Sequence, residues 1–392
     1  MKEYKLSELL EIKNGRDHKH LPDGEFPVYG SGGFMRSVAN FLYDHPSILL
    51  PRKGSLNNIQ YADTPFWTVD TLYYTIIDQT KVNPYYLYCY LSRLDLSYLD
   101  SGTGVPSMTF DSYYNIKVIL PDLATQNSIA STLSSINQKI ACNNAINHYL
   151  EAMAKQLYDY WFVQFDFPDE NGKPYKSSGG KMVWNEKLKR EIPQGWSHGS
   201  LLDIANYTNG LACQKFRPTD ERKLPVIKIK EMHDGFSSET EYVTADISES
   251  VKVYDGDVLF SWSASLEVML WACGNGGLNQ HIFKVTSKNG YPKSFYYYQL
   301  LNYIAHFKRM AEARKTTMGH ITQEHLQQSI IVLPPDLTIP NQLEVRISPI
   351  LEQIVLNNQE IIKLTIQRDE LLPLLMNGQV SVTQLNNDLA NG

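Results

Sequence analysis

One pattern in the chain recurs after a shift of 214 positions, and this repeat constrains the fold more than any other feature. Residues 116–157 align with residues 330–371 without a gap. The matched pairs include Ile116 with Ile330, Val118 with Val332, Pro121 with Pro335 and Asp122 with Asp336. A chain built from two copies of a unit, each a globular part followed by a long helical segment, is expected to have a pseudo-two-fold axis.

Both copies contain a long segment in which apolar residues alternate by four and three. In the first copy these positions are Ile129, Leu133, Ile136, Ile140, Asn143, Asn147, Leu150, Ala154, Leu157 and Trp161. In the second they are Leu343, Ile347, Ile350, Ile354, Asn357, Ile361, Leu364, Arg368, Leu371 and Leu375. About five heptads in each segment predict a coiled coil rather than an ordinary surface helix.

Asparagine occupies three positions in the middle of these apolar series: Asn143, Asn147 and Asn357. A buried Asn costs stability but fixes the register of a coiled coil, because a slipped pairing leaves its amide without a partner. We therefore predict that the three residues set the register. The alternative is that the seam is locally hydrated there.

The order of the segments along the chain predicts how the two helices pair. The first helix leaves the first globular domain, and the second helix leaves the second. If the helices pair with each other they must be antiparallel, which places a globular domain at each end of a rod. If each helix instead pairs with another chain, the protein is a dimer.

The parts that precede the heptad segments have the pattern of two similar α+β domains. Short β-branched or aromatic runs bounded by Gly, Pro and Asn predict strands, and Pro84 is expected to open a helix. The expected strands cover residues 47–50, 71–77 and 116–120, then 258–260, 281–285 and 329–333, and the expected helices cover 85–94 and 294–310. The openings also match, since LSELLEIKNG at 6–15 corresponds to LLDIANYTNG at 201–210, and FPVY at 26–29 to LPVI at 224–227.

The fold class predicted from these patterns is α+β, with two similar globular domains separated by two long helices that form an antiparallel, pseudo-two-fold symmetric coiled coil. The expected divisions are a first domain at 1–122, a central helix at 123–165, a connector at 166–196, a second domain at 197–336, a distal helix at 337–378 and a tail at 379–392. The stretch 161–196, which includes the end of the central helix and the connector, is rich in Gly, Pro, Lys and Ser. It also contains aromatic residues that a simple tether would not need: Trp161, Phe162, Phe165, Phe167 and Trp184. We expect these residues to pack on the helix end or on a partner.

Composition narrows the class of protein. The four cysteines lie far apart without a CxxC pair, which fits a reducing cytoplasm and argues against a zinc cluster. No signal peptide or membrane span is apparent, so we expect a cytoplasmic protein without a membrane partner. The net charge of −6 is unusual for a chain that binds nucleic acid alone.

Motifs for catalysis are lacking. The sequence has no GxxxxGK[ST] loop, no HExxH or other metal-ligand spacing and no Asp/Glu-x-Lys nuclease cluster. The glycine clusters at 30–33 and 274–277 are expected to be turns. We therefore predict a non-catalytic chain without a metal or cofactor of its own.

A two-fold protein with a domain at each end suits duplex DNA, because two-fold DNA-binding proteins place half-sites about one turn, ~34 Å, apart. Two domains with different surfaces would recognise two different half-sites. Candidate contacts lie in polar loops whose side chains can bind bases or phosphates. They are Arg52, Lys53, Asn57, Asn58, Gln60, Thr103 and Ser107 in the first domain, and Trp262, Ser263, Asn279, Gln280, His281, Lys315, Thr316 and His320 in the second. Ordinary solvation of a loop is the alternative for each residue.

The connector sequence WFVQFDFPDENGKPYKSSGGKMVWNEKLKREIPQGW closely resembles the central region of specificity subunits of Type I restriction-modification systems. The resemblance extends over essentially the whole chain, although the globular halves match only in outline. It implies two target recognition domains, spaced by an antiparallel coiled coil, that read a split DNA sequence.

The resemblance also implies partners. Two methyltransferase subunits, which bind S-adenosylmethionine and methylate adenine, would dock on the helices and the connector, where the connector's aromatic residues would face them. Two restriction subunits, which use ATP and Mg²⁺, would join the complex. Large partners could then supply phosphate contacts that this acidic chain lacks.

Two other functions remain open from the sequence. The chain could be a non-enzymatic coiled-coil scaffold with two peptide- or glycan-binding domains, which predicts no sequence-selective DNA binding. It could also be a stand-alone nuclease or methyltransferase, which the missing motifs disfavour.

Overall fold

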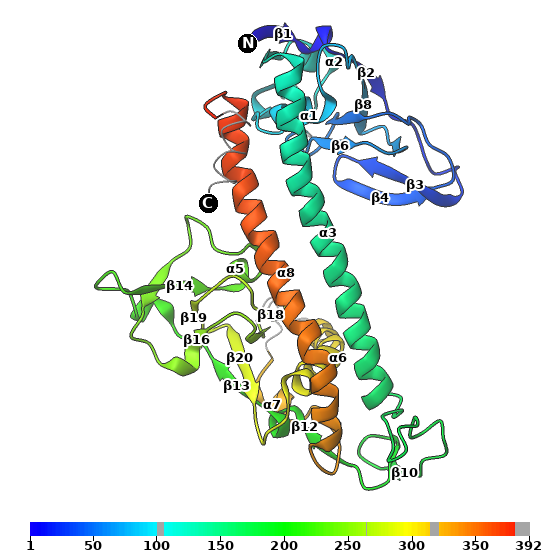
Figure 1. Ribbon diagram of the computed structural model, residues 1–392, viewed down its shortest axis with the longest axis vertical. Helices are drawn as coiled ribbons and strands as arrows, with labels where there is room; N and C mark the ends of the chain where they lie inside the picture. Colours follow the sequence, from blue (N-terminus) through cyan, green and yellow to red (C-terminus); the bar gives the residue numbers. More distant parts are fainter. Residues whose placement is uncertain (100–105, 264, 314–320, 381–392) are drawn as a thin grey trace. The chain divides into compact units, whose positions relative to one another are not determined.

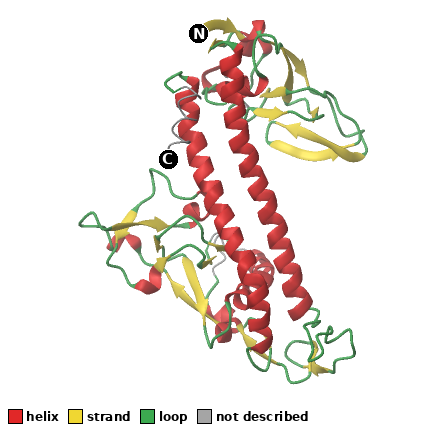
Figure 2. Cartoon of the chain, in the orientation of Figure 1, coloured by secondary structure: helices red, strands yellow, loops and turns green. Residues whose placement is uncertain are grey.

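The computed structural model of the chain describes residues 1–99, 106–263, 265–313 and 321–380 (Figure 1). The chain divides into two compact units. Unit 1 comprises Met1–Gln138 and Thr365–Gly392, and unit 2 comprises Lys139–Leu364. Each long helix contributes one part to each unit, and Figure 2 shows that each unit combines helices with strands.

Unit 1 contains two sheets and a strand pair. The larger sheet is antiparallel, in the order β2 (Leu10–Asn14), β8 (Leu72–Ile77), β5 (Ser47–Pro51) and β6 (Gln60–Ala62). The smaller sheet has the order β4 (Gly33–Val38), β3 (Asp23–Gly30) and β7 (Trp67–Thr68), and β3 and β7 are parallel. The remaining elements are β1 (Lys2–Lys5) paired with β9 (Lys117–Leu120), the helices α1 (Pro84–Leu91) and α2 (Phe110–Tyr114), and the 3₁₀ turns Leu6–Glu8 and Ser97–Leu99.

Unit 2 repeats this arrangement. Its larger sheet has the order β13 (Ala205–Asn209), β20 (Ile282–Ser287), β17 (Val258–Ser261) and β18 (Glu267–Leu270). Its smaller sheet has the order β15 (Tyr242–Thr244), β14 (Lys223–Ile227), β19 (Gly276–Leu278) and β16 (Lys252–Val253), and β14 and β19 are parallel. The remaining elements are β12 (Ser197–Ser200) paired with β21 (Ile330–Leu333), the helices α4 (Leu201–Ile204), α5 (Ile229–Asp234), α6 (Lys293–Ala313) and α7 (Gln323–Gln327), and the 3₁₀ turns Cys213–Lys215 and Glu249–Val251.

The shared strand order confirms the two similar α+β domains predicted from the repeat. The strands β5, β8, β9, β17, β20 and β21 all coincide with predicted strands to within a residue or two at each end. Alternating β-branched and aromatic side chains suit a half-buried sheet. β5 is buried on both faces, because Ile48 and Leu50 belong to one hydrophobic cluster and Leu49 to another. The smaller, partly parallel sheets were not predicted.

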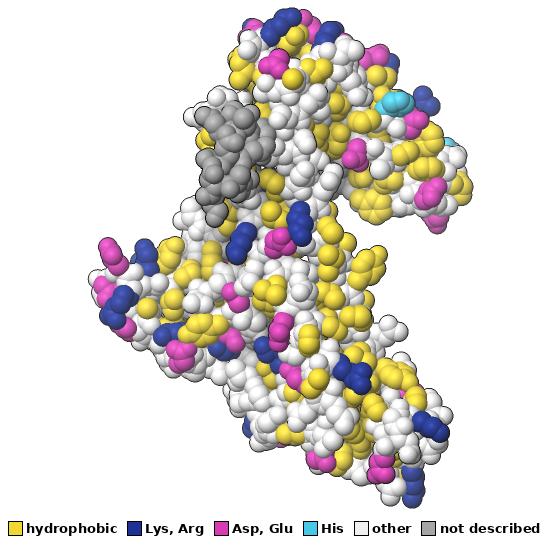
Figure 3. Space-filling view, in the orientation of Figure 1, with side chains coloured by type: hydrophobic (Ala, Val, Ile, Leu, Met, Phe, Trp, Pro, Cys, Tyr) yellow, Lys and Arg dark blue, Asp and Glu magenta, His cyan; other side chains and the backbone are white. Residues whose placement is uncertain are grey.

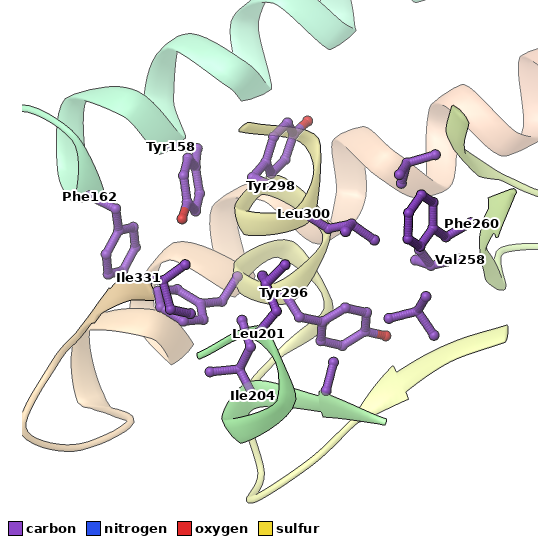
Figure 4. Close-up of a cluster of buried hydrophobic side chains, with 14 of the residues drawn as sticks. Tyr158, Phe162, Leu201, Ile204, Val258, Phe260, Tyr296, Tyr298, Leu300 and Ile331 are labelled. Carbon is purple, nitrogen blue, oxygen red and sulfur yellow. The ribbon is translucent and has the colours of Figure 1, made fainter. Parts of the chain in front are cut away.

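Each unit has its own hydrophobic core. In unit 1 the sheet residues Ile48 and Leu50 pack with α1 and with Leu133, Leu375 and Met376 of the two long helices. In unit 2 a larger core joins the sheet to the other parts of those helices, and Figure 4 shows Phe260, Tyr298 and Tyr158 among its members. The long helices are therefore integral to both cores.

Each long helix begins a few residues after a strand, and an aspartate just before it accepts a hydrogen bond from a backbone N–H of the first turn. α3 (Leu123–Phe162) follows β9, and Asp122 accepts a hydrogen bond from the Thr125 backbone N–H at 2.9 Å. α8 (Thr338–Met376) follows β21, and Asp336 accepts one from the Thr338 backbone N–H at 2.8 Å. Because these bonds favour the carboxylate, they lower the pKa of both aspartates.

α3 and α8 contact each other in both units, and the contacts in unit 2 run antiparallel. In unit 2 the Asn143 side-chain amide donates to Glu360 Oε2 at 2.8 Å, and farther along α3 Asn147 accepts from the Asn357 amide at 2.8 Å. In unit 1 Arg368 donates to the Asn137 side-chain oxygen at 3.1 Å. The helices therefore pair within one chain.

Candidate nucleic-acid interface

Three loop segments meet at one edge of the larger sheet in unit 1. They are residues 16–20 after β2, residues 52–59 between β5 and β6, and residues 69–71 before β8. The Arg16 backbone N–H donates to the Thr68 carbonyl at 2.8 Å, and the Arg52 backbone N–H donates to the Thr71 carbonyl at 2.9 Å. The residues that flank β8 thus hold the other two loops in place.

The same three segments meet in unit 2. They are residues 211–217 after β13, residues 262–263 and 265–266 between β17 and β18, and residues 279–281 before β20. The Leu211 backbone N–H donates to the Leu278 carbonyl at 2.7 Å, and the Trp262 backbone N–H donates to the His281 carbonyl at 3.3 Å. Two equivalent loop surfaces therefore exist, one in each domain.

A glycine at the start of each surface explains the close approach of these segments. A Cβ atom on Gly15 would lie 2.1 Å from the Val69 carbonyl oxygen, and one on Gly210 would lie 2.3 Å from the Asn279 carbonyl oxygen. No side chain fits at either position without moving the backbone. The aligned Asn-Gly pairs of the two openings thus have a common packing role.

Arg52 and Trp262 occupy equivalent positions in the two surfaces. Besides the N–H contacts above, the Arg52 carbonyl accepts from the Met108 N–H at 2.9 Å, and the Trp262 carbonyl accepts from the Ile321 N–H at 3.1 Å. The backbone is therefore held in the same way while the side chains differ. Arg52 Nη1 donates to the Asp70 carbonyl at 3.3 Å, whereas the Trp262 indole N–H donates to Asn209 Oδ1 at 3.1 Å.

Three other candidates in unit 1 make contacts within their own domain. Asn57 binds Asp95 and the Leu96 backbone N–H, Asn58 donates to the Ser31 carbonyl at 2.7 Å, and Gln60 donates to the Gly30 carbonyl at 2.9 Å. These amide groups hold the loop in shape. Lys53 is exposed, and its backbone forms a bridge with Ser107.

In unit 2 one of the described candidates is buried and the others lie at or near the surface. Ser263 is buried, so its hydroxyl is not on the surface. His281 is exposed and its ring lies 5.7 Å from the Trp262 ring, centroid to centroid, while Asn279 Oδ1 accepts from the His281 backbone N–H at 3.3 Å. Gln280 is half-buried beside them. Thr103, Lys315, Thr316 and His320 lie outside the described residues.

Exposed cations that the sequence analysis did not select lie on both surfaces. They follow the two Asn-Gly pairs: Arg16 and Lys19 in unit 1, and Lys215 and Arg217 in unit 2. The alignment of the openings was the signal that could have identified them. The chain is acidic as a whole, yet each loop surface contains a local pair of positive charges.

The aromatic residues near the connector are mostly internal. Trp161, Phe162, Phe165 and Phe167 are buried in the core of unit 2, where the Trp196 ring lies 5.1 Å from Phe167 and 5.7 Å from Phe165. These four side chains pack at the helix end, which is one of the two alternatives expected from the sequence, and their burial leaves them little surface to offer a partner. Trp184, in the hairpin of β10 (Met182–Asn185) and β11 (Arg190–Pro193), is 57% exposed.

Asn143, Asn147 and Asn357 are all buried between α3 and α8. Asn147 accepts from Asn357 and also donates to Asn358 Oδ1 at 2.8 Å, so its amide is bonded on both sides. A shift of either helix would break these bonds and leave buried polar groups unpaired.

Within the described ranges, no group of three or more His, Cys, Asp or Glu side chains is arranged to hold a metal ion. In the same ranges, no helix is both long and apolar enough to span a membrane.

Comparisons with known proteins match most of the chain. The family model described as Type I restriction modification DNA specificity domain matches residues 1–152 and 193–368. The chain is 24% identical over 362 residues to the Type I restriction enzyme MjaIX specificity subunit of Methanocaldococcus jannaschii, covering 88% of this chain and 80% of that protein. It is 24% identical over 339 residues to the HindI specificity subunit of Haemophilus influenzae, covering 71% of this chain and 72% of that protein.

The fold is also similar to a solved structure. The Type-I restriction-modification system S subunit from M. genitalium superposes with a TM-score of 0.65 over 95% of each chain, at 14% sequence identity.

Proposed function

Because the chain belongs to the Type I restriction modification DNA specificity family, whose specificity subunit is non-catalytic, we propose that its two domains read the two halves of a bipartite, asymmetric DNA target. The observation that carries this proposal is the pair of equivalent loop positions held by Arg52 and Trp262. Identical backbone contacts support an arginine in one domain and a tryptophan in the other. Two surfaces of one design with different side chains suit two different half-sites.

We assign the first half-site to Arg52 and Lys53 and the second to Trp262, Gln280 and His281. An arginine can bind guanine O6 and N7, and the polar edges of Gln and His can bind adenine or phosphate. Asn57, Asn58, Gln60, Ser107, Ser263 and Asn279 would act mainly by shaping these loops. Thr103, Lys315, Thr316 and His320 remain predicted contacts.

The helices α3 and α8 would act as the spacer between the half-sites. Their antiparallel contacts and the buried Asn147–Asn357 pair support a coiled coil with a fixed register. If both helices are lengthened by seven residues, the spacing between half-sites should increase while the bases read in each half stay the same.

We further propose that two methyltransferase subunits and two restriction subunits complete the complex, which would act on cytoplasmic DNA. S-adenosylmethionine would be bound by the methyltransferase subunits, and ATP with Mg²⁺ by the restriction subunits. An apolar face of α3 supports a protein partner, because Ile146, Tyr149 and Met153 lie at helical spacing and are exposed, Tyr149 by 72%. Figure 3 shows hydrophobic side chains gathered over the middle of α3.

Such partners would explain how a chain with a net charge of −6 binds DNA. Much of the affinity of DNA-binding proteins comes from phosphate contacts, and these can be supplied by any member of a complex. The cations at Arg16, Lys19, Lys215 and Arg217 would supply local contacts only.

The proposal is tested by expressing the chain with its methyltransferase subunit and mapping adenine methylation across the host genome. We expect methylation at one motif of two short specified sequences separated by a gap. Trp262→Ala should relax one half of this motif and Arg52→Ala the other. Methylation at an undivided motif, or at none, would show that the assignment of function is wrong.

A further inference from the structure

The smaller sheets of the two domains differ in the element that comes after the first strand of the parallel pair. In unit 2, β14 leads into α5. In unit 1, β3 turns back through Ser31 and Gly32 into β4 and forms a hairpin. In unit 2 the corresponding antiparallel pair, β14 with β15, is joined by α5 and residues 235–241 in place of this two-residue turn.

The tip of the hairpin is slender. A Cβ atom on Gly32 or Gly33 would meet no other atom within 4 Å, and Gly33 has a φ of +116°, which favours glycine. The turn therefore projects from the sheet with little side-chain bulk. A two-stranded ribbon of this kind fits the major groove of B-DNA.

Two large apolar side chains come directly after the turn. Phe34 is 63% exposed and Met35 is 54% exposed. Both line a hollow of about 780 Å³ whose wall also includes Lys19, Asp70 and Thr71. Adjacent exposed apolar side chains beside a hollow favour a binding surface over chance exposure. Figure 3 shows hydrophobic side chains gathered over this hairpin.

The hairpin tip is tied to the loop that carries Arg52 and Lys53. Asn58 donates to the Ser31 carbonyl at 2.7 Å, and Gln60 donates to the Gly30 carbonyl at 2.9 Å. Because Asn58 and Gln60 belong to the β5–β6 segment, the tip and the loop form one surface. A ligand that spans this surface could therefore contact Arg52, Lys53 and Phe34 together.

The charges around the hollow identify the occupant. Lys19, Asp17 and Asp70 line the hollow itself. Arg52 and Lys53 adjoin it, because the backbone N–H groups of both donate to the Thr71 carbonyl, and the exposed Arg16 directly precedes Asp17. Four cations therefore lie beside two carboxylates. This surface combines net positive charge with a projecting apolar side chain. It suits a ligand whose negative charges flank a groove that contains apolar groups. A DNA duplex has this chemistry, since its phosphates flank a major groove in which thymine presents a C5-methyl group.

We propose that Phe34, at the tip of the β3–β4 hairpin, contacts a thymine C5-methyl group in the major groove of the half-site read by unit 1. This inference rests on the proposed function and adds one determinant to it. Met35 forms the wall of the hollow behind Phe34. Unit 2 would lack this contact, because α5 and residues 235–241 replace the short turn between its two equivalent strands, β14 and β15.

The test uses the complete complex with its methyltransferase subunits and duplexes in which each thymine of that half-site is replaced in turn by deoxyuridine. The half-site is the one that Arg52→Ala disrupts. Deoxyuridine lacks only the methyl group, so at one position the wild-type complex should bind about fourfold more weakly, the factor expected for burying one methyl group. Phe34→Ala should weaken binding to the thymine duplex and bind both duplexes equally.

Two further variants serve as controls. Phe41→Ala removes another exposed phenylalanine, one that packs edge-on against Phe26 away from the tip, and should keep the fourfold difference. Phe34→Leu should retain part of the difference, because it remains apolar. Since Phe34 is mostly exposed, its replacement is not expected to unfold the domain.

The outcomes are distinguishable. If no deoxyuridine position in that half-site weakens wild-type binding, or if Phe34→Ala keeps the difference, the thymine contact is wrong. It is also wrong if Phe34→Ala weakens binding of a methyltransferase subunit and leaves the ratio between duplexes unchanged. If the wild-type complex prefers no split sequence at all, the proposed function itself fails.

Discussion

In both globular domains a four-stranded antiparallel sheet lies beside a smaller sheet with one parallel strand pair, but the loops built on this frame differ. The two domains keep the glycine at the end of the first sheet strand and the backbone contacts at Arg52 and Trp262. They differ in the side chains at those positions and in the element that comes after β3 or β14. Backbone geometry was therefore retained after the duplication, while the exposed surface changed.

A second difference concerns the junction with α3. In unit 2 the aromatic residues Phe162, Phe165 and Phe167 enclose Trp196 and join the helix end to the connector. The 214-residue repeat does not extend to this aromatic cluster. Unit 2 therefore has a stabilising element of its own.

Removing the centre of that junction should give the largest effect. Phe165 is fully buried, and Phe165→Ala should lower the free energy of unfolding of unit 2 by about 3–5 kcal/mol, the usual cost of such a truncation. Denaturant unfolding measures the change. Trp184→Ala is the matched control, because Trp184 is exposed and its removal should change stability little. Equal destabilisation by both variants would contradict the assignment of a core role to Phe165.

Exchanging the side chains at the equivalent loop positions should affect recognition without affecting folding. Arg52→Ala should weaken discrimination in one half-site by roughly 1–3 kcal/mol, the range for a good base contact, and Trp262→Ala should act only on the other half-site. Binding to duplexes with single base changes measures both effects. If either variant weakens both half-sites equally, its residue has a phosphate-binding or folding role instead.

Removing the cations beside these positions should change affinity uniformly. In the double variant Arg16→Ala with Lys19→Ala, the slope of log K against log salt concentration should become shallower. The change should be about 0.9 for each phosphate that the variant no longer neutralises, and the recognised bases should stay the same. The variant Lys215→Ala with Arg217→Ala should behave in the same way in the second domain. A change in the preferred sequence would show that these side chains contact bases.

The smallest effect concerns a charge on the helix pair. The amide of Asn143, followed by Lys139, lowers the pKa of Glu360 below its ordinary value of 4.5. A lowered folded-state pKa stabilises the fold above about pH 4.5 and loses this contribution as pH falls through the lowered value. Asn143→Ala should raise the pKa of Glu360 toward 4.5 in an NMR titration. An unchanged pKa would show that Lys139 alone sets it.

The frame could be predicted from the sequence because it depends on local periodicity. Heptads locate α3 and α8, and β-branched runs such as SILL and IKVIL locate β5 and β9. The repeat at a shift of 214 positions then indicates that the two domains have the same fold. Antiparallel pairing follows from the order of segments, and the Asn147–Asn357 bond agrees with it.

The candidate surface was harder to predict because it depends on contacts between distant segments. Arg16 and Lys19 join the surface only because β2 pairs with β8, and Phe34 joins it only through the bonds of Asn58 and Gln60 to the hairpin turn. Ser263, Asn57 and the connector rings are suited to binding by residue type, yet burial or internal hydrogen bonds occupy them. Composition alone carries no information about such pairing.

The backbone bonds at Arg52 and Trp262 have a consequence for inheritance. Main-chain N–H and carbonyl groups are common to every amino acid except proline, which lacks the N–H, so they persist through most substitutions at these two codons. Under the proposed function, a single mutation there would change which DNA sequence is recognised without sending the lineage through unfolded intermediates. Selection could then act on recognition one codon at a time.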